Sequence, residues 1–328
     1  MLQEAFHSKD LSAFRFLVSG GAGFIGSNIV EYLLKYGARE VRVLDNLSSG
    51  FVENLRAFQS LPNFTFIEGD ISDYDLCLKA CEGIDYVSHQ AALGSVPRSL
   101  KDPIGTNKAN IDGFVNMATA ARLQGVQRMV FASSSSVYGD SLDLPKMENQ
   151  IGRPLSPYAV SKYANELYAK VFTDNYGQEL IGLRYFNVFG PRQSPQGDYA
   201  AVIPLFIQAL TRGEAPIING DGKQTRDFTF VENAVQANIL ALFTDNKRAL
   251  GESFNVALGE SFSLLQLVNY LEDIIGVQVK PIHRENREGD IRDSLADVSK
   301  AKELLSYSPE IHFKTGLQKT VDYFSTNK

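Results

Sequence analysis

The first half of the chain alternates short apolar runs with amphipathic stretches of helical periodicity. Short apolar runs bounded by turn residues are typical of buried parallel strands. The six predicted strands are residues 16–19, 41–45, 64–68, 86–90, 129–133 and 180–185. Because a helical pattern follows each run, we predict an α/β fold, a Rossmann-type doubly wound parallel sheet with helices on both faces.

The pattern becomes less regular beyond about residue 190, where glycine, proline and arginine interrupt segments 190–197 and 213–226. We expect residues 190–328 to form mainly a smaller substrate-binding lobe over the carboxyl ends of the strands, with some segments returning to the sheet. Residues 15–189 would form the cofactor-binding domain. Residues 1–14 contain no long apolar run, so we expect an N-terminal extension or a helix on the surface rather than a signal peptide.

Composition narrows the class of protein. The 328 residues are 44% hydrophobic and 21% charged, as in an ordinary globular protein with a sizeable core. A net charge of −6 argues against a broad nucleic-acid or membrane surface, so an anionic ligand would need a local cluster of arginines. No stretch reaches the ~18–20 apolar residues of a membrane span, and we expect a cytoplasmic protein. Cys77, Cys81 and four dispersed histidines predict neither a disulfide framework nor a metal site.

A glycine-rich segment, residues 20–26, follows the first predicted strand and opens a helix. Glycine allows a tight turn and lets backbone N–H groups approach a pyrophosphate. Asp45 ends the second strand, near the offset expected for a carboxylate on the adenosine ribose. Asn46 follows it with no arginine beside it for a 2′-phosphate, which favours NAD over NADP, although Arg42 keeps NADP open. A simple glycine-rich turn is the alternative.

Two further strand ends are candidates for cofactor contacts. Asp70 and Ile71 could border the adenine, and Gln90, Ala91 and Ala92 could admit the nicotinamide half. Ordinary strand-end and turn chemistry is the alternative for both.

Tyr158 and Lys162 are four residues apart on a predicted helix and therefore share one face. A free tyrosine ionises near pH ~10, and a neighbouring cation favours the phenolate. The pair could therefore act as a general base, or be a solvated helix face. The fifth strand ends in a serine run, residues 133–136, where a hydroxyl could bind a reacting oxygen or simply be loop polarity.

Together these motifs make the chain resemble the extended short-chain dehydrogenase/reductase family, and within it the UDP-hexose 4-epimerases, over nearly its whole length. The resemblance rests on residues 20–26, 44–46, 68–71, 133–140, 156–162 and 183–187. It implies that Tyr158 is the base, Lys162 its cationic partner and a ligand of the nicotinamide ribose, and Ser134 the catalytic serine. Ser135 and Ser136 remain rival hydroxyls. The implied NAD-binding residues are Gly20, Gly23, Phe24, Ile25, Gly26, Asp45, Asn46, Ser49, Gly50, Asp70, Ile71, Gln90, Ala91, Ala92, Asn110, Tyr158, Lys162 and Phe186.

The resemblance also implies a site for a UDP-sugar. Arg226 and Arg287 would bind the diphosphate near Asn187, and Asp290 would contact the uridine ribose; guanidinium groups suit phosphate. Taken singly, each arginine could equally be a surface residue or a structural ion pair. The implied substrate-binding residues are Ser95, Arg98, Ser134, Ser135, Ser136, Tyr158, Asn187, Gln193, Val202, Arg226, Arg287, Asp290 and Ser294.

The implied reaction is NAD-dependent C4 epimerisation of a UDP-hexose through a 4-keto intermediate. Ser294 matches the position that gates sugar size, and serine leaves room for a 2-acetamido group, so the resemblance favours UDP-GlcNAc, UDP-GalNAc or their uronic acids. Ser95, Arg98 and Gln193 are candidates for contacting that group or the moving ring. Galactose-type epimerases carry a lysine where this chain has Gly94, so another residue, such as Arg98, must make that contact.

Three rival functions remain. The 4,6-dehydratases carry an Asp-Glu pair where this chain has Ser135 and Ser136, and UDP-glucuronate decarboxylases usually keep a glutamate in the same turn. A non-catalytic NAD-binding regulator commonly loses the tyrosine or lysine, which this chain retains. The resemblance also suggests a homodimer through helices 110–123 and 158–176.

Overall fold

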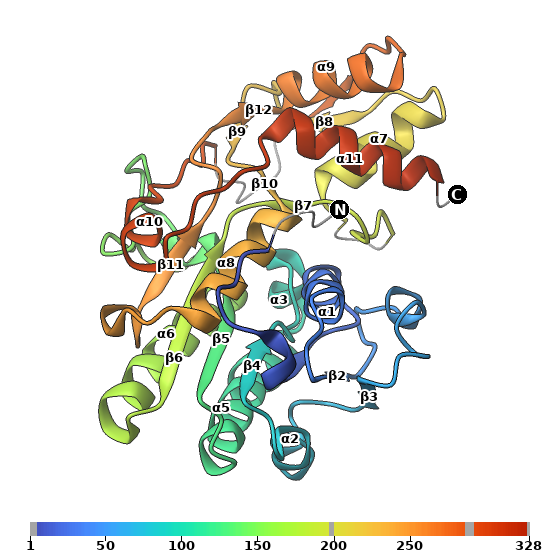
Figure 1. Cartoon of the computed structure of the whole chain (residues 1–328). Coiled ribbons are helices and arrows are strands. Elements are labelled where there is room, and N and C mark those ends of the chain that lie inside the picture. The colour runs from blue at the N-terminus through green and yellow to red at the C-terminus, as the bar shows by residue number, and fades with distance from the viewer. Residues whose placement is uncertain (1–4, 197–199, 286–291, 327–328) are drawn as a thin grey trace.

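The computed structural model describes residues 5–196, 200–285 and 292–326. Its centre is a seven-stranded sheet in which all neighbouring strands are parallel (Figure 1). The strands are β1 (Arg15–Ser19), β2 (Glu40–Asp45), β3 (Phe64–Glu68), β4 (Tyr86–His89), β5 (Arg128–Ser134), β6 (Glu179–Tyr185) and β11 (Ser253–Val256). Their order is β11-β6-β5-β4-β1-β2-β3. All six predicted strands are confirmed, and the order reverses between β1 and β4, as in doubly wound folds.

The seventh strand, β11, is one that the sequence pattern does not predict. It is four residues long and pairs with β6 at the edge of the sheet. A run this short, with two buried apolar side chains, Phe254 and Val256, does not stand out from the irregular sequence around it. Part of residues 190–328 therefore belongs to the central sheet.

Helices cover both faces of the sheet. α1 (Phe24–Lys35) and α8 (Val231–Phe243) pack together on one face, and α2 (Tyr74–Cys81), α5 (Gly113–Leu123) and α6 (Pro157–Tyr176) cover the other (Figure 1). Each layer encloses its own cluster of buried apolar side chains. Burial on both faces explains why the strands read as continuous apolar runs rather than as alternating ones.

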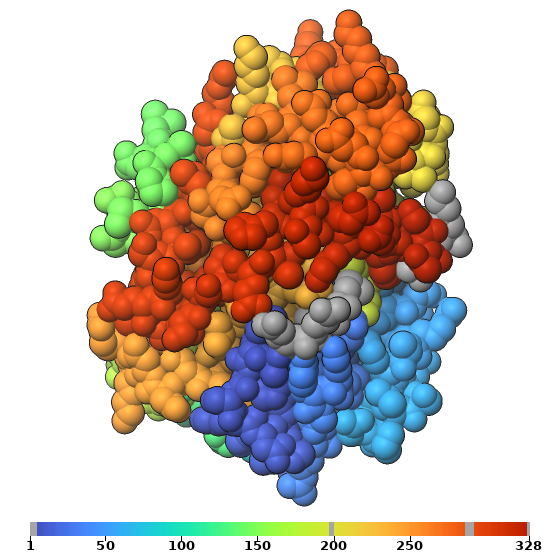
Figure 2. Space-filling view, turned by 45° about the horizontal axis from the view of Figure 1, so that its top comes forward, coloured from blue at the N-terminus to red at the C-terminus, as the bar shows by residue number. Residues whose placement is uncertain are grey.

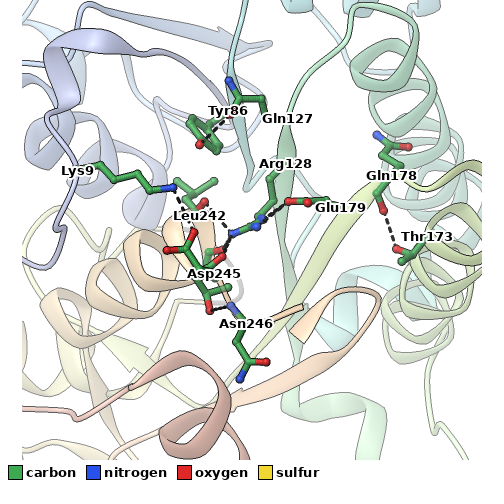
Figure 3. A network of polar contacts seen from close by, with 12 residues as sticks. Lys9, Tyr86, Gln127, Arg128, Thr173, Gln178, Glu179, Leu242, Asp245 and Asn246 are labelled. Atoms are coloured by element: carbon green, nitrogen blue, oxygen red, sulfur yellow. Dashed lines mark hydrogen bonds and ion pairs between the residues drawn. The ribbon is translucent and has the colours of Figure 1, made fainter. Parts of the chain in front are cut away.

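Arg128 links β5, β6 and the end of α8 at the amino-terminal ends of the strands (Figure 3). Its guanidinium group donates to the carboxylate of Glu179 at 2.6 and 2.9 Å, linking the first residues of β5 and β6. It also donates to the carbonyl oxygens of Ala241, Leu242 and Thr244 at 2.7–3.0 Å. Because the last carbonyl groups of a helix lack partners within it, Arg128 closes the carboxyl end of α8.

Residues 5–14 pack on the sheet domain and contain a single short 3₁₀ turn, η1 (Leu11–Ala13), in place of the surface helix considered above. The backbone N–H of Phe6 donates to the Tyr32 hydroxyl at 2.6 Å, and Leu11 is buried. Phe14 packs edge-on against Tyr86. This segment therefore extends the core between α1 and the end of α8.

A smaller lobe lies over the carboxyl ends of the strands (Figure 1). It contains α7 (Val202–Thr211), β8 (Ile217–Asn219), β9 (Thr225–Arg226), β12 (Phe262–Ser263), α9 (Leu264–Ile275), β13 (Ile282–Arg284) and α11 (Phe313–Thr326), and it has its own apolar core. The remaining elements are η2 (Val52–Leu55), α3 (Val96–Lys101), α4 (Pro103–Asn107), η3 (Lys108–Asp112), η4 (Ser135–Tyr138), β7 (Val188–Phe189), β10 (Thr229–Phe230), η5 (Lys247–Ala249) and α10 (Ser299–Leu305). The C-terminal residues pack across the junction between this lobe and the N-terminal half (Figure 2). None of the helices within the described ranges is long and apolar enough to span a bilayer.

Candidate active site

Three adjoining cavities lie where the strands end. The first has a volume of about 340 Å³ and is lined by the loops after β1, β2, β3 and β4, around the point where the strand order reverses. Ligands bind at this point in doubly wound sheets. Eleven residues of the predicted cofactor site line it: Gly20, Gly23, Asp45, Asn46, Ser49, Gly50, Asp70, Ile71, Gln90, Ala91 and Ala92.

The glycine loop has the geometry of a pyrophosphate cradle. Gly20 has a φ of +72°, and a Cβ atom there would lie 2.5 Å from the Ala91 nitrogen. A Cβ atom on Gly26 would overlap the Gly20 carbonyl oxygen. Gly23 is the N-cap residue of α1 and has no side chain to cap the helix, so the first N–H groups of the helix are available to an anion. The residues present therefore fit a dinucleotide.

Asp45 lies in the cavity at the end of β2. Its carboxylate accepts hydrogen bonds from the backbone N–H groups of Ala22 and Leu47, at 2.9 and 2.8 Å. Burial raises the pKa of Asp45, and the two N–H donors oppose this shift. Arg42 donates instead to Glu40 and to two backbone carbonyl groups at the end of α2. Its guanidinium group is thus committed away from the ribose, which supports NAD over NADP.

The second cavity, of about 520 Å³, contains the predicted catalytic residues. It extends from the glycine loop to the end of β5, the start of α6 and the loop after β6. Predicted residues that line it are Gly20, Gly23, Phe24, Ile25, Gly26, Ser49, Gln90, Ala92, Ser95, Arg98, Ser134, Tyr158, Lys162, Asn187 and Gln193. The structure therefore brings the predicted base, cation and serine into one space with the cofactor loop.

The start of α6 positions Tyr158 and Lys162. Ser156 caps the helix by accepting from the Ala159 N–H at 3.1 Å. The Lys162 ammonium donates to the carbonyl oxygen of Ala132 at 2.7 Å and lies 6.0 Å from the centre of the Tyr158 ring.

The protonation of this pair differs from the sequence expectation. Burial raises the pKa of the Tyr158 phenol, and a hydrogen bond with Ser134 opposes that shift. Burial also lowers the pKa of Lys162 to about 8, and the Glu166 carboxylate opposes that shift. In the protein alone, burial outweighs the hydrogen bond with Ser134, so the pKa of the phenol stays above its ordinary value.

The four serines of residues 133–136 differ in their positions and hydrogen bonds. Ser134 lines the catalytic cavity, and its Oγ accepts from the N–H and the hydroxyl of Ser136 at 3.2 and 3.0 Å. Ser135 and Ser136 begin η4 and, in the described part of the chain, do not line any of the three cavities. Ser133 donates to Glu166 at 2.5 Å. Of the three predicted hydroxyls, Ser134 is therefore the one beside Tyr158.

The third cavity, of about 580 Å³, lies in the smaller lobe. Asn187 and Gln193 line both this cavity and the catalytic one, so the two are continuous there. Val202 and Arg226 line it as well. Ser294 does not line it, but its N–H donates to the Thr225 carbonyl oxygen at 3.2 Å, next to Arg226. Arg287 and Asp290 lie outside the described residues.

Two predicted cofactor residues are buried behind the cavities. Asn110 bonds to the backbone of Leu93 and to the Ser161 hydroxyl, and so ties the loop after β4 to α6. Phe186 packs against Tyr138.

Among the residues in or behind the cavities that were not predicted are Lys108, Glu166, Tyr185 and Asp227. Glu166 had a signal in the sequence, because it lies two helical turns after Tyr158 on the same face.

Comparisons with known proteins agree with this geometry. Residues 16–257 match the model of the NAD dependent epimerase/dehydratase family. The chain is 39% identical to a putative UDP-glucose 4-epimerase of Methanocaldococcus jannaschii, over 95% of this chain and 98% of that protein. It is also similar to two solved structures. One is a UDP-N-acetylglucosamine 4-epimerase from Methanobrevibacter ruminantium in complex with UDP-N-acetylmuramic acid, with 41% identity, a TM-score of 0.91 and 96% and 99% of the chains covered.

The other is a UDP-glucose 4-epimerase from Thermotoga maritima with UDP-glucose, with 38% identity, a TM-score of 0.89 and 95% and 99% of the chains covered. The family match spans most of the chain, and the glycine cradle and Asp45 suit the cofactor named in the family description. The protein therefore belongs to the NAD dependent epimerase/dehydratase family, and NAD is its cofactor.

Proposed function

We propose that the protein catalyses the reversible C4 epimerisation of a UDP-hexose. The observation that carries this proposal is the meeting of Ser134, Tyr158 and Lys162 in a cavity that joins the cofactor loop to a second cavity bearing Arg226. Both similar solved structures are 4-epimerases.

The absence of a second acid favours epimerisation over elimination. Within the described residues, no aspartate or glutamate lines the catalytic cavity, and the positions after Ser134 are occupied by two serines. Removal of water from a sugar needs an acid and a base besides the redox base. Oxidation and reduction at C4 need Tyr158 alone for the proton.

Each residue has a role in this reaction. Tyr158 takes the proton of the sugar 4-hydroxyl, and Ser134 donates a hydrogen bond to the same oxygen. The positive charge of Lys162 favours the phenolate as the proton moves. NAD, when bound, supplies a reversible acceptor for the C4 hydride. Arg226 would hold the diphosphate while the 4-keto sugar turns in the cavity, so that its other face could be presented to the cofactor.

We further propose that the sugar is an N-acetylhexosamine, as UDP-GlcNAc and UDP-GalNAc, or a corresponding uronic acid. Ser294 lies beside the strand that carries Arg226, and its side chain is smaller than the tyrosine of epimerases restricted to glucose and galactose. The M. ruminantium structure is that of a UDP-N-acetylglucosamine 4-epimerase, which supports this choice, whereas the T. maritima enzyme is described with UDP-glucose.

Incubation with UDP-GlcNAc, without added NAD, tests the reaction. Formation of UDP-GalNAc, followed by chromatography, is the expected result. A 4-keto-6-deoxy product would indicate a dehydratase, and bound NAD without turnover would indicate a regulator.

The sugar preference is tested by Ser294→Tyr. We expect this variant to lower the turnover of N-acetylated sugars while sparing UDP-glucose. Equal losses for both sugars would contradict a gate at position 294.

We also propose that the enzyme is a cytoplasmic homodimer that pairs through α5 and α6. α6 exposes an apolar stripe at helical spacing in which Val160, Leu167 and Val171 are 50–53% exposed and Tyr168 is 41% exposed. Leu123, at the end of α5, is 55% exposed. A stripe of this kind on a soluble enzyme marks an interaction surface.

A further inference from the structure

The last three residues of β5 each lie beside a residue of α6. The Ala132 carbonyl oxygen accepts from Lys162 at 2.7 Å, and the Ser133 hydroxyl donates to Glu166 at 2.5 Å. Ser134 lines the catalytic cavity together with Tyr158, and its hydroxyl opposes the rise in the pKa of the phenol. The helix residues are spaced by four, so they lie on one face of α6, one turn apart. Two of these three contacts involve the proposed catalytic residues, and the third involves Glu166.

Glu166 is fixed from the opposite side by Arg184. The guanidinium group of Arg184, on β6, donates to both carboxylate oxygens of Glu166, at 2.9 and 2.7 Å. Both side chains are nearly inaccessible, at 4% and 7% exposure. Arg184 is the residue opposite Ser133 in the pairing of β5 with β6. A bidentate pair of this kind sets orientation as well as energy.

Arg184 is in turn held in place. It donates to the Tyr138 hydroxyl and to the Glu148 carbonyl oxygen, both at 3.0 Å, and it stacks on the Tyr138 ring. Tyr138 ends η4, and Ser134 is the residue that caps the start of this turn. The Glu166 carboxylate thus lies in a buried network that reaches both ends of the turn bearing the catalytic serine.

We propose that Glu166 is a positioning residue of this active site: it fixes the α6 face that carries Tyr158 and Lys162 against the strand end that carries Ser134, and its charge keeps Lys162 protonated. The expected effects on kcat rest on the proposed epimerase function. The effect of the Glu166 charge on the pKa of Lys162 can be measured on the protein without turnover.

The charged and titratable groups around Lys162 indicate that Glu166 is the residue that keeps the lysine protonated. On α6, Tyr158 is neutral in the resting protein, because burial raises its pKa. On β4, His89 is neutral as well, because burial lowers its pKa to about 3. On β6, Arg184 carries a positive charge. The Glu166 carboxylate is the group that raises the pKa of Lys162 against the effect of burial.

Four variants separate geometry from charge. Ser133→Ala removes one contact and keeps the charge, so it should lower kcat about tenfold with an unchanged pH profile. Glu166→Asp keeps the charge on a shorter side chain and should behave in the same way. Glu166→Gln removes the charge and should also move the alkaline limb of the kcat profile about one pH unit toward acid. Glu179→Gln, at the amino edge of the same strands, removes another arginine-paired carboxylate and should leave the profile unchanged (Figure 3).

Two precautions keep the inference testable. Glu166→Gln leaves the positive charge of Arg184 buried without its carboxylate, so the double variant Glu166→Gln/Arg184→Met replaces it if the single variant does not fold. The pKa of Lys162 is also measured by NMR of ¹³C-labelled lysine, with the signal assigned by Lys162→Met. It should fall in Glu166→Gln and stay near the wild-type value in Glu166→Asp.

An unchanged Lys162 pKa in Glu166→Gln would overturn the electrostatic role. Full kcat in Ser133→Ala and Glu166→Asp would overturn the geometric one. Absence of epimerisation by the wild-type enzyme would instead refute the proposed function, and the NMR measurement would still decide the effect of Glu166 on Lys162.

Discussion

Replacing Asp227 by asparagine perturbs a fully buried carboxyl group that joins three segments beside the third cavity, the proposed substrate site. The carboxylate accepts from the N–H groups of Leu258, Gly259 and Ala296, at 3.0–3.2 Å. The backbone carbonyl of Asp227 accepts from the Asn187 side chain at 3.1 Å. One residue therefore links the loop after β6, the loop after β11 and the segment before α10.

The magnitude follows from the protonation of this group. Burial raises the pKa of Asp227 from 3.8 to about 7, although the three N–H donors oppose the shift. Between these values the folded protein holds a proton that the unfolded chain has released. The stability contributed by that proton is therefore complete below pH 3.8 and is lost as the pH rises through 7. This contribution is about 2.7 kcal/mol at pH 5 and close to zero at pH 8.

Urea unfolding followed by circular dichroism at pH 5, 6, 7 and 8 measures this effect. Asparagine does not titrate, and the other ionisable groups cancel in the comparison. From pH 5 to pH 8 the wild type should lose about 2.7 kcal/mol more than Asp227→Asn. Asp245→Asn, at a side chain that is 89% exposed, should follow the wild type. A difference between wild type and Asp227→Asn that is equal at every pH would refute the reasoning.

Three further outcomes are expected. Tyr158→Phe should lower kcat about 10²–10⁴-fold with bound NAD retained, measured by turnover and by the absorbance of released cofactor; loss of NAD would show a structural role instead. Gly26→Ala should abolish NAD retention, because its Cβ would overlap the Gly20 carbonyl oxygen, and an unchanged NAD content would contradict the cradle. Val171→Glu should convert the proposed dimer into monomers in sedimentation, since it places a charge in the apolar stripe of α6; an unchanged mass would contradict an interface on α6.

The sheet could be predicted because its strands are buried on both faces. Each of the six runs in the first half is apolar along its length, and local sequence is enough to recognise that pattern. β11 could not be recognised in this way. It exists because it pairs with β6 at the edge of the sheet, and that pairing depends on the whole fold.

The cofactor loop could also be predicted, since the requirement for glycine is local. A Cβ atom at Gly20 or Gly26 would collide with backbone atoms of the same site. Glycine at these two positions therefore indicates close backbone packing in the loop. The resemblance also predicts cofactor contacts for Asn110 and Phe186, and these stay predictions. The structure adds that both side chains contact other elements, which the motif does not reveal.

Glu166 and Asp227 were missed for a different reason. Neither belongs to a short motif with a known chemistry, and each acts through partners that are distant in sequence: Glu166 through Ser133 and Arg184, and Asp227 through residues 258, 259 and 296. A carboxylate in a sequence is more often a solvated surface group than a buried one. The structural role of such a buried carboxylate can be recognised only in the folded protein, where its hydrogen-bond donors surround it.

The position of Lys162 changes the explanation of how the tyrosine is activated. Four-residue spacing suggests a cation in direct contact with the phenol, yet the ammonium is bonded to the Ala132 carbonyl, and burial raises the pKa of Tyr158. Proximity on the helix is therefore not enough to lower the pKa of the phenol. The lysine must first stay charged in a buried position, where its own pKa falls to about 8. That requirement explains why an acidic side chain lies one turn further along the same face. The pair recognised in the sequence depends on a third residue, Glu166, whose charge supports the lysine and whose contact with Ser133 sets the distance to the serine.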